Sequence, residues 1–516
     1  MKFRHAATTA QRAVRHWSTV LVVVAAIAAP AHAATIHVDL TIGSDCLTTY
    51  DPATRSCSGG SSAGYRTLSA GLGAATPGDT VLLRAGTYGQ LAPSVSGTAG
   101  QPITIKNYTG ETATITGSVM ALWIIGRSDL IIDGLTVSST SGFCRLEDST
   151  RITLQNNTFQ NSTGSGTTAG CKFVRSANNR VLNNNITNGN DSFLLQDDSD
   201  RNLVTGNTFD TGRHSLVSIR CSSYNLFRNN TFKNPIQKAV EIYDCAGVSD
   251  APVRYDDTRR NLFEYNKFIQ TSASSQDNDY NAMQHGGQEA IVRRNEYRNN
   301  LGGGIYYQSY SSESLYVYKN RAYNNTFYAN ACYALTGDSE SATRYYDNRM
   351  TNNLLYKNTN CSGGATQTRI PDPTVVILTN NTLATSDPGF ISESGNDFRL
   401  TPGSSQVDAG VFVTRAVGNG SGTSLQVADA GYFSDGLGIT GEVGDLIQLQ
   451  GQSTRATIVS ITSSTNVLTL SQSLSWTDGQ GVHLAYTGAA PDIGAYERDL
   501  TSGSVPAAPR NLRVVN

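Results

Sequence analysis

Short stretches of alternating apolar and polar residues fill the middle of the chain and return with a period in the twenties. Leu216–Ile219 and Asn225–Phe227 are typical, each bounded by Asn, Gly, Ser or Asp. Alternation with a period of two is the pattern of a β-strand, and no helical spacing of useful length runs through this region. Short strands that recur in this way must stack in parallel, so the pattern predicts a solenoid of β-coils.

An asparagine followed two residues later by an apolar residue marks each repeat. The motif begins at Asn157, Asn184, Asn207, Asn230, Asn266, Asn295, Asn320 and Asn348, with spacings of 27, 23, 23, 36, 29, 25 and 28 residues. Longer spacings are expected where a loop leaves the coil. Asparagines at the same bend of successive coils can form a ladder of stacked amides, so we assign them a structural role.

Eight cysteines support the same repeat. Pairing neighbours predicts the disulfides Cys46–Cys57, Cys144–Cys171, Cys221–Cys245 and Cys332–Cys361. The last three pairs are 27, 24 and 29 residues apart, which is the length of one coil. Disulfides are the expected use of cysteine in an exported protein. Metal binding is less well supported, because the sequence has no CxxC motif and no cluster of histidines.

The N-terminal segment predicts export. A basic start is followed by the short apolar run Val20–Ala29 and by Ala31-His32-Ala33, which fits a cleavage site before Ala34. The apolar run is too short to favour a membrane span. Residues 1–33 are therefore assigned to a signal peptide, and the mature protein is expected to be extracellular or periplasmic.

The charge of the mature chain restricts its partners. The signal segment carries four of the 39 basic residues and none of the 41 acidic ones, which leaves 35 basic against 41 acidic residues. This balance argues against a nucleic-acid partner, which requires a basic face. An anionic polysaccharide stays compatible, because a local basic stripe can bind it. We expect a monomer.

Segments near both ends resemble those of a known group of proteins. Pro77–Tyr88 follows a segment at Tyr65–Leu72, and Pro491–Glu497 follows Asp387–Phe390 at a distance. In these segments the chain resembles bacterial right-handed parallel β-helix proteins related to pectate lyases and chondroitinase-B-like polysaccharide lyases. The resemblance covers most of residues 35–500. It implies an all-β, right-handed parallel β-helix with a capping helix, and an exported protein that acts on a polysaccharide.

The closing segment is interrupted between Gly410 and Pro491. Within the interruption, Val443–Leu449 and Ala456–Ile461 alternate like antiparallel strands. We therefore expect a small β insert near the C-terminus. The predicted division is a signal peptide at 1–33, the β-helix at 34–411, the insert at 412–488, a closing strand at 489–500 and a tail at 501–516.

Stacking the coils on the motif and on the cysteines predicts columns of side chains, because strand residues alternate between faces. The first outward column is Glu147, Val174, Asp197, Arg220, Asp244, His285, Tyr310 and Asp338. The second, two residues earlier, is Arg145, Lys172, Leu195, Ser218, Ile242, Met283, Gln308 and Thr336. The inward column is Cys144, Cys171, Leu194, Val217, Glu241, Ala282, Tyr307 and Leu335. Glu241 is the member that does not suit an apolar core, unless a local twist or a buried partner such as Lys238 accommodates it.

The first outward column predicts an active centre. Its members Asp197, Arg220, Asp244 and His285 would stand on successive coils, about 5 Å apart and within coupling range of one another. Leu216–Arg220 is similar to the strand that carries an arginine in chondroitinase-B-like and alginate lyases. Val240–Asp244 stands where those enzymes have a Glu-x-Glu-Ile-Ile strand, and the match there is loose.

A lyase removes the C5 proton of a uronic acid, so it needs positive charge at the carboxylate and a base. For the reaction itself we assign Arg220 and Lys238 to the carboxylate, His214 and His285 to the base, and Tyr310 to the acid. Candidates for substrate binding are Arg145, Lys172, Gln308 and Tyr307. The resemblance makes Ca²⁺ a candidate cofactor, with oxygen ligands from Asp197, Asp198 and Asp244.

Two other classes of function stay open. Gln196–Asp198 and Gly212–His214 are similar to the Asp-Asp and Gly-His-Gly elements of polygalacturonases, which are glycoside hydrolases with paired carboxyl groups. A β-helix with exposed aromatic residues could also be a carbohydrate-binding solenoid or adhesin without catalytic activity. The lyase is the preferred hypothesis, because the predicted row combines cations with a base.

Overall fold

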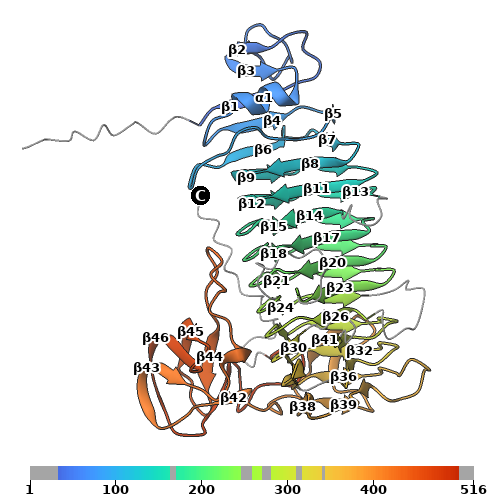
Figure 1. Ribbon diagram of the computed structural model, residues 1–516, viewed down its shortest axis with the longest axis vertical. Helices are drawn as coiled ribbons and strands as arrows, with labels where there is room; N and C mark the ends of the chain where they lie inside the picture. The colour runs from blue at the N-terminus through green and yellow to red at the C-terminus, as the bar shows by residue number, and fades with distance from the viewer. Residues whose placement is uncertain are drawn as a thin grey trace, which may run out of the picture.

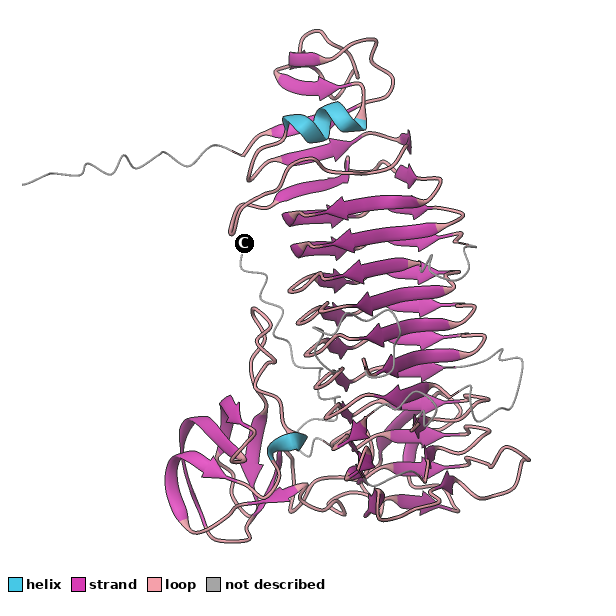
Figure 2. Cartoon of the chain, in the orientation of Figure 1, coloured by secondary structure: helices cyan, strands magenta, loops and turns pink. Residues whose placement is uncertain are grey.

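The computed structural model describes residues 33–162, 170–245, 258–269, 281–309, 316–339 and 343–498. They form a right-handed parallel β-helix with a smaller β unit beside its C-terminal end (Figures 1 and 2). Nearly all of the predicted signal peptide and the whole tail at 501–516 lie outside the described residues. No helix among the described residues is long and apolar enough to cross a membrane.

The central coils each contribute one strand to each of three long sheets, and the first coils contribute to fewer. The 15-stranded sheet contains β1 (Thr35–Val38), β2 (Cys46–Tyr50), β3 (Ser62–Tyr65), β4 (Thr80–Leu83), β6 (Ile103–Asn107), β9 (Ser128–Asp133), β12 (Thr150–Gln155), β15 (Arg180–Leu182), β18 (Leu203–Thr205), β21 (Leu226–Arg228), β24 (Leu262–Glu264), β27 (Ile291–Arg293), β31 (Arg321–Tyr323), β35 (Asn348–Thr351) and β38 (Val376–Thr379). The 12-stranded sheet contains β5 (Gly86–Tyr88), β7 (Ala113–Thr116), β10 (Thr136–Ser138), β13 (Thr158–Gln160), β16 (Asn185–Thr187), β19 (Thr208–Asp210), β22 (Thr231–Lys233), β25 (Lys267–Ile269), β28 (Glu296–Arg298), β32 (Thr326–Tyr328), β36 (Leu354–Tyr356) and β39 (Thr382–Ala384). The 10-stranded sheet contains β8 (Met120–Ile125), β11 (Gly142–Glu147), β14 (Cys171–Val174), β17 (Asp191–Gln196), β20 (Ser215–Arg220), β23 (Lys238–Tyr243), β26 (Met283–Gly286), β29 (Ile305–Tyr307), β33 (Leu335–Gly337) and β37 (Thr368–Arg369).

The N-terminal end of the stack is covered by the antiparallel pair β2–β3 and by helix α1 (Leu68–Ala74). Thr67 caps the helix, since its hydroxyl accepts a hydrogen bond from the Ala70 backbone N–H at 3.2 Å. Leu68 and Leu72 are buried in the main hydrophobic core. The capping helix implied by the sequence resemblance is therefore present, and it shields the first coil from water.

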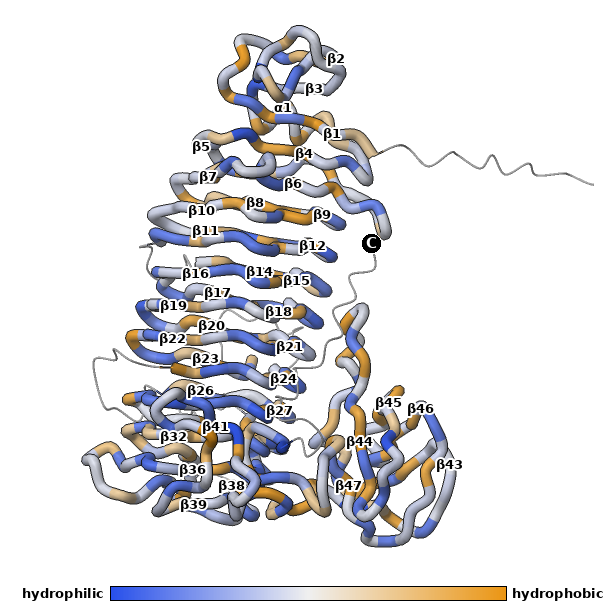
Figure 3. The backbone as a smooth tube through the Cα atoms, turned by 180° about the vertical axis from the view of Figure 1, so that it is seen from behind, coloured by the Kyte–Doolittle hydropathy of each residue, from blue (hydrophilic) through white to orange (hydrophobic). Residues whose placement is uncertain are grey.

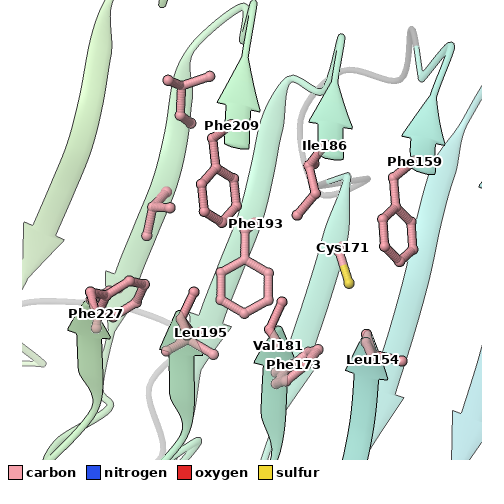
Figure 4. Close-up of a cluster of buried hydrophobic side chains, with 14 of the residues drawn as sticks. Leu154, Phe159, Cys171, Phe173, Val181, Ile186, Phe193, Leu195, Phe209 and Phe227 are labelled. Carbon is pink, nitrogen blue, oxygen red and sulfur yellow. The ribbon is translucent and has the colours of Figure 1, made fainter. Parts of the chain in front are cut away.

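Parallel in-register strands place like side chains directly above one another in the core. The rings of Phe209, Phe232, Phe268, Tyr297 and Phe327 stack in sequence, with centroid separations of 5.2, 4.9, 4.4 and 4.7 Å. Figure 4 shows the beginning of this column, where Phe159, Ile186 and Phe209 point inward. Hydrophilic and hydrophobic positions interchange along the coils (Figure 3), as expected for strands with one buried face.

Buried asparagines form the predicted ladder. The ladder begins at Asn157, whose Oδ1 accepts from the Leu135 N–H. In each later member the Oδ1 accepts hydrogen bonds from the backbone N–H and the Nδ2 of the asparagine one coil earlier, through Asn184, Asn207, Asn230, Asn266, Asn295, Asn325, Asn353 and Asn381. The assignment of Asn320 and Asn348 to this ladder was wrong. They belong to a second ladder at the bend before the 15-stranded sheet, which also contains Asn202, Asn225 and Asn261.

All four predicted disulfides are present, namely Cys46–Cys57, Cys144–Cys171, Cys221–Cys245 and Cys332–Cys361. Cys144 and Cys171 are direct partners in the strand register, as predicted. Cys245 follows Tyr243, the partner of Arg220, by two residues, whereas Cys221 follows Arg220 by one. Because of this offset, the residues of β23 on the outward face differ by one position from those predicted.

Residues between the β-helix and its closing segment form a six-stranded antiparallel sheet, here called the insert (Figure 1). Its strands are β42 (Thr414–Arg415), β43 (Gly420–Gln426), β44 (Leu446–Leu449), β45 (Arg455–Thr462), β46 (Val467–Trp476) and β47 (Gly481–Leu484). Buried Arg293 of β27 joins the insert to the solenoid by pairing with Glu264 at 2.7 Å and Asp445 at 2.6 Å. Three small elements complete the fold, the parallel pair β30 (Val317–Tyr318) and β34 (Tyr345–Tyr346), the hairpin β40 (Phe390–Ser392) and β41 (Asp397–Leu400), and a 3₁₀ helix at Ala430–Tyr432.

Candidate functional site

The outward face of the 10-stranded sheet carries two columns of side chains set by the observed register. One column runs through Trp123, Arg145, Lys172, Leu194, Ser218, Glu241, Gln284, Tyr306 and Thr336. The other runs through Ile125, Glu147, Val174, Gln196, Arg220, Tyr243 and Gly286. The predicted columns agree with these through β11 and β14 and for β20, and they slip by one residue in β17, β23 and β26.

Asp244 therefore does not stand in a row with Arg220, and this part of the predicted site was wrong. The partner of Arg220 in the next coil is Tyr243. Asp244 is fully buried, and its Oδ1 accepts hydrogen bonds from the N–H groups of Cys245 at 2.8 Å and Thr258 at 3.2 Å. Its Oδ2 accepts one from Gln288 at 3.0 Å. These bonds give Asp244 a structural role in holding the bend.

His285 also lies elsewhere than predicted. It pairs with Ile242 and Tyr307 in the register and points into the core, where its side chain is fully buried. Burial lowers the pKa of His285 to about 3, so the ring is neutral at ordinary pH. Tyr307 is likewise fully buried, and its neighbour Tyr306 takes the outward position. Neither His285 nor Tyr307 can reach a substrate on the outer face.

The slip has a local cause. The turn after β17 holds one more residue than those after β14 and β20, and both Asp197 and Asp198 adopt positive φ there, at 54° and 56°. The additional residue moves Gln196 into the column that the spacing assigned to Asp197. Gln308 is half-buried just after β29, and Tyr310 lies outside the described residues.

A compact cluster of polar side chains stands at the beginning of β17, β20 and β23. His214 is half-exposed, with 39% of its side chain accessible, and its Nδ1 lies 2.8 Å from Oδ1 of Asp191. The second carboxylate near this nitrogen is Glu241, at 3.7 Å. Because Asp191 engages Nδ1, the ring's other nitrogen, Nε2, is the one that can act on a bound molecule.

Glu241 is the anchor of this cluster and not a surface group, since 1% of its side chain is exposed. Lys238 forms an ion pair with its Oε1, and the Tyr243 hydroxyl donates to the same oxygen at 2.5 Å. The Ser215 hydroxyl donates to Oε2 at 3.2 Å. In the predicted register Glu241 is an anomaly of the inward column that a local twist or a buried partner such as Lys238 would explain, and the structure has the ion pair with Lys238. That anomaly was the one signal that the register assumed for β23 was off by one.

The pKa of His214 follows from these neighbours. The hydrogen bond with Asp191 raises it above the ordinary value of 6.5, burial opposes the shift, and the charge of Glu241 adds to it.

A pH profile tests this assignment. If neutral His214 acts as the general base of an enzymatic reaction, kcat/KM must rise as pH increases through a pKa above 6.5. Replacing Asp191 with Asn removes the largest raising effect, so the acid limb of the pH profile should move to lower pH. Initial rates measured from pH 5 to 9 on both proteins test this, and an unshifted limb would contradict it.

Three cations continue the site along the same face. Arg145, Lys172 and Arg220 belong to β11, β14 and β20, and all three side chains are partly exposed. Burial, supported by the charges of Arg145 and Arg220, lowers the pKa of Lys172. Arg145 pairs with Glu147 at 2.7 Å. The face therefore carries positive charge on β11, β14 and β20 together with the His214 cluster, an arrangement that suits a carboxylated sugar.

The three carboxylates predicted to bind Ca²⁺ do not converge. Asp244 has both oxygens occupied by hydrogen bonds from the protein. Asp197 accepts a hydrogen bond from Gln196 at 3.1 Å at its own turn. Among the described residues, no three His, Cys, Asp or Glu side chains lie close enough together to hold a metal ion. This donor set does not fit Ca²⁺, and no step of the chemistry below is assigned to it.

Comparisons with known proteins agree with the fold. Residues 120–254 match the family model described as a right-handed β-helix region. A curated relative, the uncharacterized protein YwoF of Bacillus subtilis (strain 168), is 37% identical over 86 residues, which are 15% of this chain and 18% of that protein. The match thus spans less than a fifth of the relative's length.

Solved structures with a similar β-helix include enzymes of two classes. A pectate lyase shares 13% identity at a TM-score of 0.42, covering 90% of this chain and 98% of that one. An alginate lyase from Paenibacillus sp. shares 15% at 0.35, covering 60% and 95%. A lacto-N-biosidase from Eubacterium ramulus shares 11% at 0.45, covering 68% of each chain. At this identity the likeness concerns the fold alone.

Proposed function

We propose that this protein is an exported polysaccharide lyase that cleaves a uronic-acid-containing polymer by β-elimination on the outward face of the 10-stranded sheet. One observation carries the proposal: a half-exposed His214, oriented by Asp191, stands on the same face as Lys172 and Arg220. Four disulfides support an oxidising compartment outside the cytoplasm.

The chemistry divides among these groups. Asp191 fixes the tautomer of His214 so that Nε2 carries the lone pair and takes the C5 proton. Arg220 and Lys172 stabilise the negative charge that develops on the uronate carboxylate and the adjoining carbon. Tyr243, the register partner of Arg220, is half-buried, and its hydroxyl can return a proton to the leaving oxygen. Both His214 and Tyr243 approach Glu241, so base and acid lie within the width of a sugar ring.

Lys238 takes a different role from the one first assigned. Its ammonium group pairs with buried Glu241, and 9% of its side chain is exposed. A buried pair of this kind holds its two partners in place and does not bind substrate directly. We therefore assign Lys238 to positioning Glu241 beneath His214 and Tyr243, and assign the contact with the uronate carboxylate to Arg220 and Lys172.

A glycoside hydrolase fits this arrangement less well. Hydrolysis needs two carboxyl groups that flank the bond, about 5 to 10 Å apart. Glu241 lies near Asp191, but its two oxygens are occupied by Lys238, Tyr243 and Ser215. Asp191 is in turn held by His214 at 2.8 Å. Asp197 and Asp198 lie in the turn after β17, at the other end of that strand from Asp191, so the pair does not flank the same bond as the His214 cluster.

An absorbance assay separates the classes. We expect the purified chain to release unsaturated, ultraviolet-absorbing ends from one member of a panel of uronic-acid polymers. A hydrolase would release reducing ends without that absorbance, and a binding protein would release neither.

Lys172→Ala and Arg220→Ala should each lower kcat/KM by about 10²-fold, the usual loss for removing a group that stabilises developing charge. Lys233→Ala, which removes an exposed lysine from β22 in the 12-stranded sheet, is the matched control and should retain the parent rate. If Lys172→Ala and Arg220→Ala retained the parent rate, as the control should, the proposed site would be contradicted.

A further inference from the structure

A second cavity lies away from the proposed active site, between the solenoid and the insert. This cleft has a volume of about 600 Å³ and is lined by residues from the bends before β24, β27, β31 and β35 on one side. Its other side comes from β42, the 3₁₀ helix and the turn between β45 and β46. The bends belong to the 15-stranded sheet, so this cleft and the His214 cluster are on different faces of the solenoid.

The solenoid wall of the cleft is a column of alternating charge. The register places Arg260, Glu289, Lys319 and Asp347 at the same position of four successive coils. All four adopt the left-handed conformation, with φ between 49° and 54°. A residue at such a bend projects from the corner of the coil, and here the corners face the insert. The column therefore presents charged side chains to the cleft at intervals of about 5 Å.

The insert wall adds an aromatic ring and a further cation. Phe412 is half-buried and packs edge-on against Tyr486, with ring centroids 5.5 Å apart, so part of its surface stays open to the cleft. Arg415 is exposed, and its guanidinium donates to the Gly479 carbonyl at 3.1 Å. An aromatic surface beside fixed cations is a combination suited to the apolar face and the carboxylate of a uronic acid.

Most of the negative charge in the cleft is already neutralised. Asp347 and Asp429 each lie 2.8 Å from buried Arg321, and Asp347 also pairs with Arg349 at 2.7 Å. Of these pairs, Arg321 with Asp429 joins the insert to the solenoid. Lys319 and Arg415 are exposed, and the charges of both remain available to the cleft. The lining carries five cationic side chains, those of Arg260, Lys319, Arg321, Arg349 and Arg415, against the three carboxylates of Glu289, Asp347 and Asp429, so the cleft is net positive.

We propose that this cleft is a second binding site, which holds an anionic stretch of polysaccharide through Lys319 and Arg415, with Phe412 under a sugar ring. The identity of the ligand as a uronate rests on the proposed function, whereas the site itself rests on the cleft. A site on another face of the molecule keeps the polymer attached while the His214 cluster acts on a different segment, since a tethered substrate has a raised effective concentration.

The test uses the full chain carrying His214→Ala, so that no turnover occurs, and a tetramer of galacturonic acid in calorimetric titration. A second titration uses a tetramer of mannuronic acid. Lys319→Ala and Arg415→Ala are combined in that background, with Lys233→Ala as the matched control. We expect the double variant to bind one of the two tetramers about ten-fold more weakly, as for the loss of charge-assisted contacts, and the control to bind like the background. A neutral glucose tetramer should show no such difference.

The outcomes are distinct for the two proposals. Because both side chains are exposed, the double variant should melt with the background, which shows that its fold is intact. If neither tetramer binds, or if the double variant binds like the background, the cleft proposal is overturned. If the parent chain yields no unsaturated product while the double variant loses affinity, the cleft stands and the lyase proposal fails. If the parent chain forms unsaturated product and the double variant binds like the background, the lyase proposal stands and the cleft proposal fails.

Discussion

His214→Ala is expected to lower kcat on the preferred uronic-acid polymer by 10²- to 10⁴-fold, the usual contribution of a general base. The reason is geometric. His214 Nδ1 is held by Asp191 at 2.8 Å, which leaves Nε2 as the proton acceptor on an exposed face. KM should change little, because the ring is not among the cations that bind the carboxylate. Initial rates of ultraviolet absorbance over a range of polymer concentrations separate the two parameters.

A second histidine provides the control for that experiment. His285 is fully buried and points away from the outer face. His285→Leu removes the hydrogen bond that Nδ1 accepts from the Gly287 N–H at 3.3 Å but no group on that face, so the rate should stay close to that of the parent. Added imidazole should restore part of the activity of His214→Ala, because a small base can occupy the vacated space, whereas a purely structural loss would not respond. If His285→Leu loses activity and His214→Ala does not, the base has been assigned to the wrong side of the sheet.

The solenoid could be predicted from the sequence because each of its signals is repeated. The spacing of Asn157, Asn184 and Asn207 gave the coil length, and the Cys144–Cys171 pair gave the same register independently. Stacked amides and the disulfide between these two strands fix that alignment for β11 and β14. In consequence the fold, the four disulfides and the outward positions of Lys172 and Arg220 all agree with the structure.

The candidate site could be predicted only in part, because a slip of one residue moves a side chain to the opposite face of a strand. One additional residue at Asp197 and Asp198 was enough to displace β17. The single-residue offset of Cys245 displaced β23 and brought Glu241 outward, where it joins Lys238 and Tyr243. Bends of this kind are set by backbone conformation, which spacing alone does not reveal.

The largest loss of stability is expected from a single member of the asparagine ladder. Asn207 is buried, its Oδ1 accepts hydrogen bonds from the N–H and Nδ2 of Asn184 at 2.8 and 3.0 Å, and its Nδ2 donates to the carbonyl of Val181 at 2.8 Å and to Asn230 at 3.0 Å. Asn207→Leu keeps the branch at Cγ but leaves these partners buried without a hydrogen bond. Each such group costs about 1–3 kcal/mol, so the free energy of unfolding should fall by roughly 3–5 kcal/mol.

The residue just before a ladder asparagine supplies the matched control, because different coils carry different residues at that position. Asn229 stands before Asn230 with φ at 56°, and in the previous coil the same place is taken by Gly206, with φ at 71°. A glycine is therefore already accepted at this bend, and Asn229→Gly should change the free energy of unfolding by less than about 1 kcal/mol. Urea denaturation followed by circular dichroism measures both variants. If the backbone hydrogen bonds alone stabilised the coils, the free energy of unfolding would fall no more in Asn207→Leu than in Asn229→Gly. Equal losses would show that the amide side chains do not stabilise the stacked coils.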